Sequence, residues 1–418
     1  MGRRRAAAGA RTLPDRLDRA RAAGGIRHLP PLGVPARRER ARCSRPNRRH
    51  QRGPGHGPVV DPVADRGGPP LGAAVTDRKR LTVNYLLEDT ALFGGVKIPL
   101  HHANLLHRRG HRVRVLSRGP RPDWYPLAVP FATVPEFTGD VVPEADVHVA
   151  TFWTTIAPAA ALPHGRPVHY CQGFEASYTH NRDEHPRILA AYSLPLPAFA
   201  LAPHLADIVR DRFGRPVRVV PPALEPMWRP RWRWRPSRRP RVAVAHPFEV
   251  DWKGVATALE AVRRLRADGL EVALVRVSQW PLSEAERALV EPDEFHCRIS
   301  PAEVARLIAG CDLMLAPSWE QEGFGLPVLE AMACGVPVVA SRIQAFTGFS
   351  DGAAELVPAD DPGVFAGAAR AILGDRGRWR AMRRAGLRAA AAFSERRVVA
   401  AVEEALRWVA SDAWRAER

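Results

Sequence analysis

Short apolar runs and amphipathic stretches alternate along the chain from Leu81 onward. The apolar runs are bounded by turn-forming residues and predict buried strands at residues 81–87, 112–117, 145–152, 166–171, 198–203 and 217–220. Stretches with helical spacing lie between several of these runs, at residues 96–111 and 204–214. The alternation predicts an α/β domain built on a doubly wound parallel sheet.

The alternation stops at residues 221–240, PPALEPMWRPRWRWRPSRRP. Proline disrupts strand pairing and arginine stays in water, so this segment is predicted to be a linker between two domains. Trp228, Trp232 and Trp234 stand among its arginines. Two interpretations are open for them: packing on a domain face, or contact with an acceptor or a membrane surface.

A second alternating region follows the linker. It predicts strands at residues 241–246, 271–277, 312–318 and 337–341. It predicts helices at residues 254–269, 301–310, 361–373 and 394–410. The whole pattern predicts two doubly wound Rossmann-like domains that face each other across a cleft. The first spans residues 81–220 and the second spans residues 241–393, while residues 394–418 form a closing helix that packs back toward the first domain. Ligands of such sheets bind beyond the carboxyl ends of the strands.

The net charge of +18 comes mostly from the start of the chain. Residues 1–80 hold 20 of the 62 Arg and Lys residues, only 6 of the 44 Asp and Glu residues, and no aromatic residue. Such a segment buries too little apolar surface to offset its ordering entropy, so a disordered basic tail is predicted. An over-long start assignment, an arm on anionic lipid, a targeting peptide and a nucleic-acid arm are the other interpretations.

Cysteine usage and hydropathy bear on the compartment. Five scattered cysteines form no CxxC pair, which is typical of reduced thiols in a cytosolic protein. No uninterrupted apolar run reaches the roughly 18 residues that a membrane span needs, so none is predicted. We therefore expect a cytoplasmic protein, with peripheral attachment to the inner face of the membrane as an option.

The segment EQEGFGLPVLEAMACGVPVV, residues 320–339, places acids and glycines beside an apolar helix. Pro327 suits a first helical position and Gly335 suits the residue after the helix end. Glu330, one turn into this helix, leans back toward the helix mouth, where Glu322 already sits. Free amide groups at the mouth favour an anion such as a diphosphate, and carboxylates accept hydrogen bonds from hydroxyls. A nucleotide sugar meets both requirements.

This segment resembles the E-x7-E signature of the retaining glycosyltransferases with the GT-B fold, the group 1 family. The likeness is highly specific across LMLAPSWEQEGFGLPVLEAMACGVPVVAS and looser from residue 81 to about residue 409. It implies that Glu330 binds the ribose of the donor and that Glu322 lies at the donor sugar as a catalytic residue. It also implies donor contacts from the turn between the two acids, at Gly323, Phe324, Gly325 and Leu326.

Two other family features are partly present. The pair Gly94-Gly95 precedes a predicted helix, which is where the family places a loop that faces the ligands. Gly95 would then face the donor phosphate and Gly94 the acceptor. A flexible turn would give the same sequence pattern. Relatives also carry an Arg followed five residues later by a Lys, which together neutralise the diphosphate. Lys253 is present here, but Phe248 stands in place of the Arg, and His246 is a candidate substitute.

Lysine is rare in this chain: Lys79, Lys97 and Lys253 are the three lysines among 62 basic residues. A lysine in a chain that mostly uses arginine then indicates a position where the broader guanidinium group of arginine cannot replace the compact ammonium. Lys253 precedes a predicted helix start, so we expect it to act as a catalytic residue that contacts the donor diphosphate.

In the first domain, relatives place a His-Asp pair after the strand that corresponds to RPVHYC. This chain has Gln172 there, with His169 and Glu175 close by. These three are candidates for the acceptor side, and His169 fits a buried core histidine equally well. A related pattern occurs among rhamnosyltransferases of surface polysaccharides. No D-x-D motif occurs, which argues against a metal-dependent GT-A enzyme, so no metal site is expected.

The resemblance therefore implies a retaining glycosyltransferase that moves a sugar from a nucleoside-diphosphate sugar to a glycan or lipid-linked acceptor, in cell-surface polysaccharide synthesis. No cofactor besides the donor is expected, and no nucleic-acid partner is expected because the excess charge is confined to the tail. Two alternatives remain: a non-catalytic nucleotide-sugar-binding protein of the same fold, and a phosphorylase, which would need a covalently bound pyridoxal phosphate.

Overall fold

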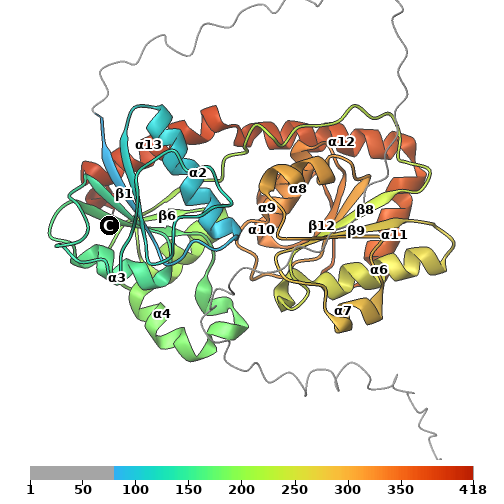
Figure 1. Ribbon diagram of the computed structural model, residues 1–418, viewed down its shortest axis with the longest axis horizontal. Coiled ribbons are helices and arrows are strands. Elements are labelled where there is room, and N and C mark those ends of the chain that lie inside the picture. The colour runs from blue at the N-terminus through green and yellow to red at the C-terminus, as the bar shows by residue number, and fades with distance from the viewer. Residues whose placement is uncertain (1–79, 418) are drawn as a thin grey trace, which may run out of the picture. The chain divides into compact units, whose positions relative to one another are not determined.

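The computed structural model describes residues 80–417. The predicted basic tail lies outside that range, apart from Arg80. The described chain contains two parallel sheets, and helices cover both faces of each (Figure 1). The predicted class, two doubly wound α/β domains, is confirmed.

The first sheet has seven parallel strands in the order β3-β2-β1-β4-β5-β6-β7. Its central strands are buried along nearly their whole length because helices cover both faces, which explains their continuous apolar runs. The strands are β1 (Thr82–Leu87), β2 (Arg112–Ser117), β3 (Phe131–Thr133), β4 (Val147–Ala150), β5 (Arg166–Cys171), β6 (Ala198–Ala200) and β7 (Val217–Val219).

Four α-helices connect these strands. They are α2 (Gly94–Arg108), α3 (Trp153–Ala161), α4 (His185–Tyr192) and α5 (Pro203–Asp207), and a π-helical turn (Ile208–Arg212) continues α5. The stretch 204–214, predicted as one helix, is therefore a short α-helix followed by this wider turn. Two 3-10 turns, Glu175–Ser177 and Thr179–Glu184, follow β5.

The second sheet has six parallel strands in the order β10-β9-β8-β11-β12-β13. The strands are β8 (Arg241–Ala245), β9 (Ala273–Ser278), β10 (Glu294–Cys297), β11 (Leu313–Ala316), β12 (Val338–Ser341) and β13 (Glu355–Val357). No regular element other than an isolated bridge at Leu224 occupies the segment between β7 and β8.

Seven α-helices accompany the second sheet. They are α6 (Val255–Ala267), α7 (Glu284–Leu289), α8 (Pro301–Ile308), α9 (Leu326–Ala333), α10 (Gln344–Ser350), α11 (Pro362–Gly374) and α12 (Arg376–Ala390). Polar caps fix where several of them begin. Ser300 accepts a hydrogen bond from the Glu303 amide at the start of α8, and Asp361 accepts two at the start of α11.

The winding of each sheet reverses beside its first strand. β1 lies between β2 and β4, and β8 lies between β9 and β11. A crevice forms at the carboxyl ends of the strands where the order reverses, and ligands of open α/β sheets bind there. The loops that leave β1, β8 and β11 at these points carry Gly94-Gly95, Lys253 and the E-x7-E segment.

One apolar core joins the two domains. The described residues belong to one compact unit. A single cluster runs from first-domain residues such as Val149 and Ile156 to Val328 and Leu329 of α9. A second cluster fills the opposite face of the second sheet, beneath α6 and α11.

The final long helix, α13 (Glu395–Ala410), packs on the first domain. Its Glu403 forms an ion pair with Arg109 and a hydrogen bond with the His111 ring, and both residues follow α2. Its Leu406 is fully buried in the first cluster. The chain therefore leaves the first domain at the linker and returns to it after α12.

None of the helices within residues 80–417 combines the length and the apolarity required to cross a bilayer.

Candidate functional site

The turn that leads into α9 has a backbone that only glycine can adopt easily. Gly325 precedes the helix with φ of 86°. A Cβ built on it would lie 2.1 Å from the Phe346 ring, so both the conformation and the packing require its bare backbone. This geometry orients the first amides of α9 toward the carboxyl end of β11.

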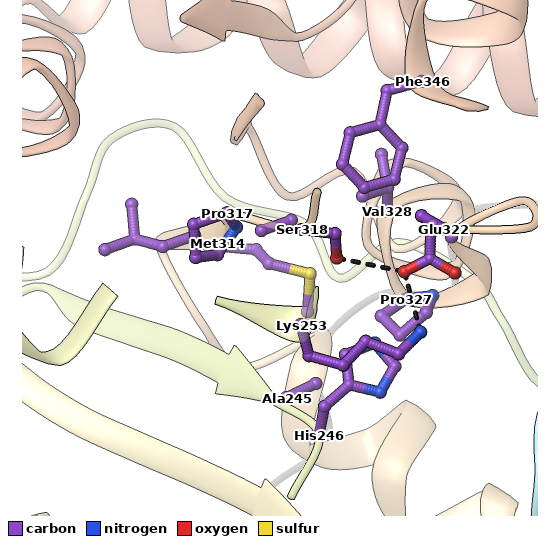
Figure 2. A pocket seen from close by; sticks show the side chains of 13 residues that line it. Ala245, His246, Lys253, Met314, Pro317, Ser318, Glu322, Pro327, Val328 and Phe346 are labelled. Carbon is purple, nitrogen blue, oxygen red and sulfur yellow. Dashed lines mark hydrogen bonds and ion pairs between the residues drawn. The ribbon is translucent and has the colours of Figure 1, made fainter. Parts of the chain in front are cut away.

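Glu322 lies at the centre of a small polar cluster in this turn. Its Oε2 accepts hydrogen bonds from Lys253 Nζ at 2.7 Å and from Ser318 Oγ at 3.0 Å (Figure 2). His246, which follows β8, lies beside Lys253 in the same cavity. The cavity has a volume of about 10 Å³, enough for one water.

The charges of this cluster are fixed by burial and by Lys253. Burial alone would raise the pKa of the Glu322 carboxyl, but the Lys253 ammonium and the hydrogen bonds outweigh it and lower this pKa to about 2. Burial, together with Lys253, lowers the pKa of His246 to about 3. Glu322 is therefore ionised and His246 neutral at pH 7. A neutral imidazole supplies no positive charge, so the candidate role of His246 as a substitute for the family Arg is not supported.

Glu330 is held by a lysine from the other domain. Lys97, in the first turn of α2, places Nζ 2.6 Å from Glu330 Oε1 and 3.0 Å from Glu225 Oε2 of the linker. The Trp228 ring lies 5.2 Å from the same ammonium, and its indole N–H donates to Glu225. One ammonium thus lies between two carboxylates at the boundary of the two domains.

This second cluster holds two carboxyl groups and one ammonium. Burial raises the pKa of Glu330, Lys97 opposes that rise, and the like charge of Glu225 adds to it. Burial alone would lower the pKa of Lys97, yet the two carboxylates raise it. Lys97 is therefore charged at pH 7.

The glycine pair and the motif turn meet between the domains. A Cβ on Gly323 would lie 2.2 Å from the carbonyl oxygen of Gln172, and a Cβ on Gly94 would lie 3.0 Å from the Leu326 side chain. Gln172 Nε2 donates to the carbonyl oxygen of Gly95 at 2.8 Å. Predicted donor-side and acceptor-side residues thus come together here, and glycine makes the approach of the two backbones possible.

The side chain of Phe324 serves the core. Its ring stacks on Phe349 with centroids 4.7 Å apart and meets Phe393 edge-on. This leaves the backbone of Phe324 as the part available to a ligand. The arrangement is consistent with the predicted contact through main-chain groups of this turn.

Two acceptor-side candidates lie in a buried network under the loop that follows β5. His169 is fully buried, edge-on to Tyr192, and burial beside Arg215 holds its pKa well below the usual value. Of the two interpretations of this residue, the core histidine is the one that its burial favours. Glu175 is 6% exposed and bonds to the Tyr192 hydroxyl, and burial raises its pKa to about 7.

The position of the missing Arg is filled by an apolar side chain. Phe248 packs against the second core cluster. The nearby Arg276 is fully buried, forms an ion pair with Glu286 and donates to the carbonyl oxygen of His246. Its guanidinium is engaged in holding the end of β8, so Lys253 is the cation that lines the cavity around Glu322.

Several contacts of the site were not predicted from the sequence. Ser318, Glu225 and the pairing of Lys97 are among them. Tyr178 also stacks on Trp252, with centroids 4.8 Å apart and planes within 8°, and so joins the first domain to the residue before Lys253. The rarity of lysine was the available signal for Lys97, because both lysines in the described chain pair with motif glutamates. Within residues 80–417, no three His, Cys, Asp or Glu side chains cluster as metal ligands do.

The fold and the site together define a protein of the GT-B class. Residues 239–375 match the family model of the glycosyl transferases group 1. The structure is similar to that of HepE from Anabaena in complex with UDP-glucose, with a TM-score of 0.63 and 14% sequence identity over 78% of this chain and 100% of that one. At this identity the similarity establishes the fold.

Two curated relatives are similar over shorter stretches. The MMP alpha-(1->4)-mannosyltransferase of Mycolicibacterium hassiacum is 36% identical over 162 residues, which is 34% of this chain and 39% of the relative. A phosphatidyl-myo-inositol mannosyltransferase of Propionibacterium freudenreichii is 29% identical over 160 residues, 38% of this chain and 40% of the relative. The chain thus spans about two fifths of the length of these relatives.

Proposed function

We propose that this protein is a retaining glycosyltransferase that moves a sugar, a hexose or deoxyhexose, from a nucleoside diphosphate to a glycan or lipid-linked acceptor. The observation that carries the proposal is the ion pair of Glu322 with Lys253 at the mouth of α9, inside the segment that matches the glycosyl transferases group 1. Relatives named as mannosyltransferases, one of them acting on phosphatidyl-myo-inositol, support this class of reaction.

The residues of the second domain have complementary tasks in this proposal. Departure of the diphosphate builds negative charge, which Lys253 and the first amides of α9 stabilise. Glu322 is ionised above about pH 2 and accepts hydrogen bonds from sugar hydroxyls. Glu330 accepts hydrogen bonds from the ribose. The donor is the substrate, and the reaction as proposed uses no further cofactor.

Donor binding in this proposal requires the site to open. The cavity beside Glu322 holds about one water, and Gly323 lies against Gln172 of the facing domain. Glu330 is also occupied by Lys97. The two domains therefore separate at the Gly94-Gly95 loop to admit the donor and close over it, which excludes water from the reaction.

The test combines nucleotide binding with turnover. UDP, GDP and dTDP are compared by thermal shift, since a ligand at 100 times its Kd stabilises by about 2.7 kcal/mol. Release of nucleoside diphosphate from the preferred donor is then measured for wild type and for Lys253→Met. The variant should lose about 2–4 kcal/mol of transition-state stabilisation, and Lys253→Arg should recover part of it.

Two results would overturn the proposal. One is the absence of any stabilisation by the three nucleotides. The other concerns Lys253: a Met variant with wild-type melting temperature and kcat/KM within about threefold of wild type would show that Lys253 does not act on the leaving group.

A second candidate is a non-catalytic nucleotide-sugar-binding protein. It is favoured by one observation: Phe248 packs in the core and His246 is neutral, so a single lysine meets the diphosphate. Such a protein would be stabilised by a nucleoside diphosphate. It would release none from UDP-glucose or GDP-mannose, with or without lipid-linked acceptors.

We further propose that the protein works in the cytoplasm at the inner face of the membrane. The cysteines of the described chain, Cys171, Cys297, Cys311 and Cys334, are free thiols, which suits a reducing compartment. A lipid-linked acceptor would be presented at that face.

A further inference from the structure

Two tryptophans stand out of the linker into solvent. Trp232 is 75% exposed and Trp234 is 60% exposed, and their ring centroids lie 4.9 Å apart. Arg233 between them points inward, where it forms an ion pair with the buried Asp312 and donates to the Cys311 carbonyl. An extended segment alternates its side chains, so anchoring Arg233 turns both neighbours outward. We call the rings of Trp232 and Trp234 the aromatic tip.

A helix with six arginines lies against this tip. Arg376 and Arg380 of α12 both donate to the carbonyl oxygen of Trp234, and Arg383 donates to that of Arg231. Residues 376, 380, 383 and 384 fall on one stripe of the helix. The linker is therefore fastened along an arginine stripe, and the tip has a fixed backbone.

Six arginines around the tip lack carboxylate partners among the described residues, whereas Arg233, Arg239 and Arg378 are paired with acids. None of the ion pairs within residues 80–417 involves Arg235, Arg238, Arg376, Arg380, Arg384 or Arg388. Arg235, Arg238, Arg376, Arg384 and Arg388 are exposed. The surface is thus strongly cationic, and its charge is not neutralised by the protein itself.

A groove of about 610 Å³ adjoins the linker at Arg231. Arg231 and Arg306 line it together with Arg241, which is paired with Glu294, and with one acid, Glu303, which is bound to Ser300 at the start of α8. Arg306 has no ion pair among the described residues. The groove extends the cationic surface inward and suits a phosphate-bearing headgroup.

We propose that the aromatic tip, the arginine stripe of α12 and this groove together form a docking surface for an anionic phospholipid bilayer. Tryptophan rings favour the headgroup layer because they are amphipathic, and each arginine near an anionic surface adds attraction. Single-stranded nucleic acid also binds arginines and aromatic rings. The rings of the tip already contact each other, however, which leaves no gap for a base between them.

The docking surface deepens the proposed function, since it would hold the enzyme where lipid-linked acceptors lie. It consists of residues outside the Glu322 cluster. Its test is therefore independent of the donor site, and thermal shift with UDP and GDP reports separately on the proposed function.

The experiment is hydrogen exchange of the full chain with vesicles of equal parts phosphatidylglycerol and phosphatidylcholine. Vesicles of phosphatidylcholine alone and a single-stranded oligonucleotide are the comparison arms. Anionic vesicles should slow exchange in residues 229–239 and 376–388, and the two other arms should not. Measuring these segments directly separates this surface from any binding by residues 1–79.

Variants complete the test through vesicle sedimentation. Trp232→Ser with Trp234→Ser, and Arg384→Ser with Arg388→Ser, should each weaken binding about tenfold or more. The control, Arg263→Ser with Arg287→Ser, removes two exposed arginines from α6 and α7, which lie below the strands in Figure 1 whereas α12 lies above them. Unchanged exchange in both segments with anionic vesicles would overturn the proposal. Slowed exchange there with the oligonucleotide but not with vesicles would do the same.

Discussion

At the scale of single residues, the site is organised by two of the three lysines in a chain whose other basic residues are arginines. Lys253 pairs with Glu322 within one domain, and Lys97 pairs with Glu330 across the two domains. Each ammonium is compact enough to fit between buried groups where a planar guanidinium would not. The two acids of the E-x7-E segment are thus held by different parts of the molecule.

Lys97→Met should destabilise the protein by about 3–5 kcal/mol, because it leaves Glu330 and Glu225 buried without their shared partner. The double variant Lys97→Met with Glu225→Gln should be less destabilised, since it removes the repulsion between the two carboxylates. Free energies of unfolding from urea titrations provide the comparison. Equal losses in the single and double variants would show that repulsion from Glu225 is not a source of the destabilisation.

Glu175 predicts a pH dependence of stability. Burial raises its pKa from 4.5 to about 7 in the folded protein, while the hydrogen bond from Tyr192 opposes that rise. Between these values the folded state keeps a proton that the unfolded state has released. Stability should therefore fall as the pH rises through this window, by about 3 kcal/mol in total.

Glu175→Gln keeps the acceptor for Tyr192 but cannot ionise. Its free energy of unfolding should lack this contribution, so wild type should lose more stability than the variant between pH 5 and pH 8. Parallel pH profiles of the two proteins would contradict the assigned pKa.

At the scale of elements, the turn into α9 depends on Gly325. Gly325→Ala should cost more than about 2 kcal/mol, because a non-glycine residue at φ of 86° is strained and its Cβ would overlap Phe346. Nucleotide stabilisation should decrease with it, since the amides of α9 would be displaced. Gly367→Ala in α11 is the matched control, because its Cβ meets nothing within 4 Å and a helix tolerates alanine well. A Gly325 variant as stable as this control would refute the argument.

Strands buried on both faces could be predicted closely from the sequence. Residues 112–117 and 166–171 form β2 and β5 with the predicted bounds. The edge strands β3, β10 and β13 were missed, because strands of three or four residues are too short to give a continuous apolar run. Helices α3, α4, α7 and α10, of six to nine residues, were missed because so few turns give little periodicity.

The site also has a part that could be predicted from the sequence and a part that could not. Glu322, Lys253 and the glycines of the turn are close in the fold of one domain, and their motif could be read directly. The contact of Lys97 with Glu330 spans 233 positions and depends on how two domains meet, which no local pattern encodes. The burial of His169 also follows from packing around it and not from its own neighbours in the sequence.

At the scale of the whole molecule, α13 belongs to the first domain although it follows the second domain in sequence. Leu406→Ala should therefore increase hydrogen exchange mainly in β1–β7, with a cost of about 2–5 kcal/mol. Ile372→Ala in α11, which is equally buried but lies in the second cluster, should increase exchange mainly in β8–β13. Faster exchange of the second sheet in the Leu406 variant would show that α13 supports the other domain.

The return of α13 to the first domain also constrains how the protein is made. A ribosome completes the first sheet early, yet the helix that covers Arg109 and His111 with Glu403 emerges only after the second sheet. The newly made first domain must wait with an uncovered apolar face while residues 220–393 are synthesised, and such exposed surface invites aggregation. During translation the second domain can therefore complete its fold before the first, although it is synthesised later.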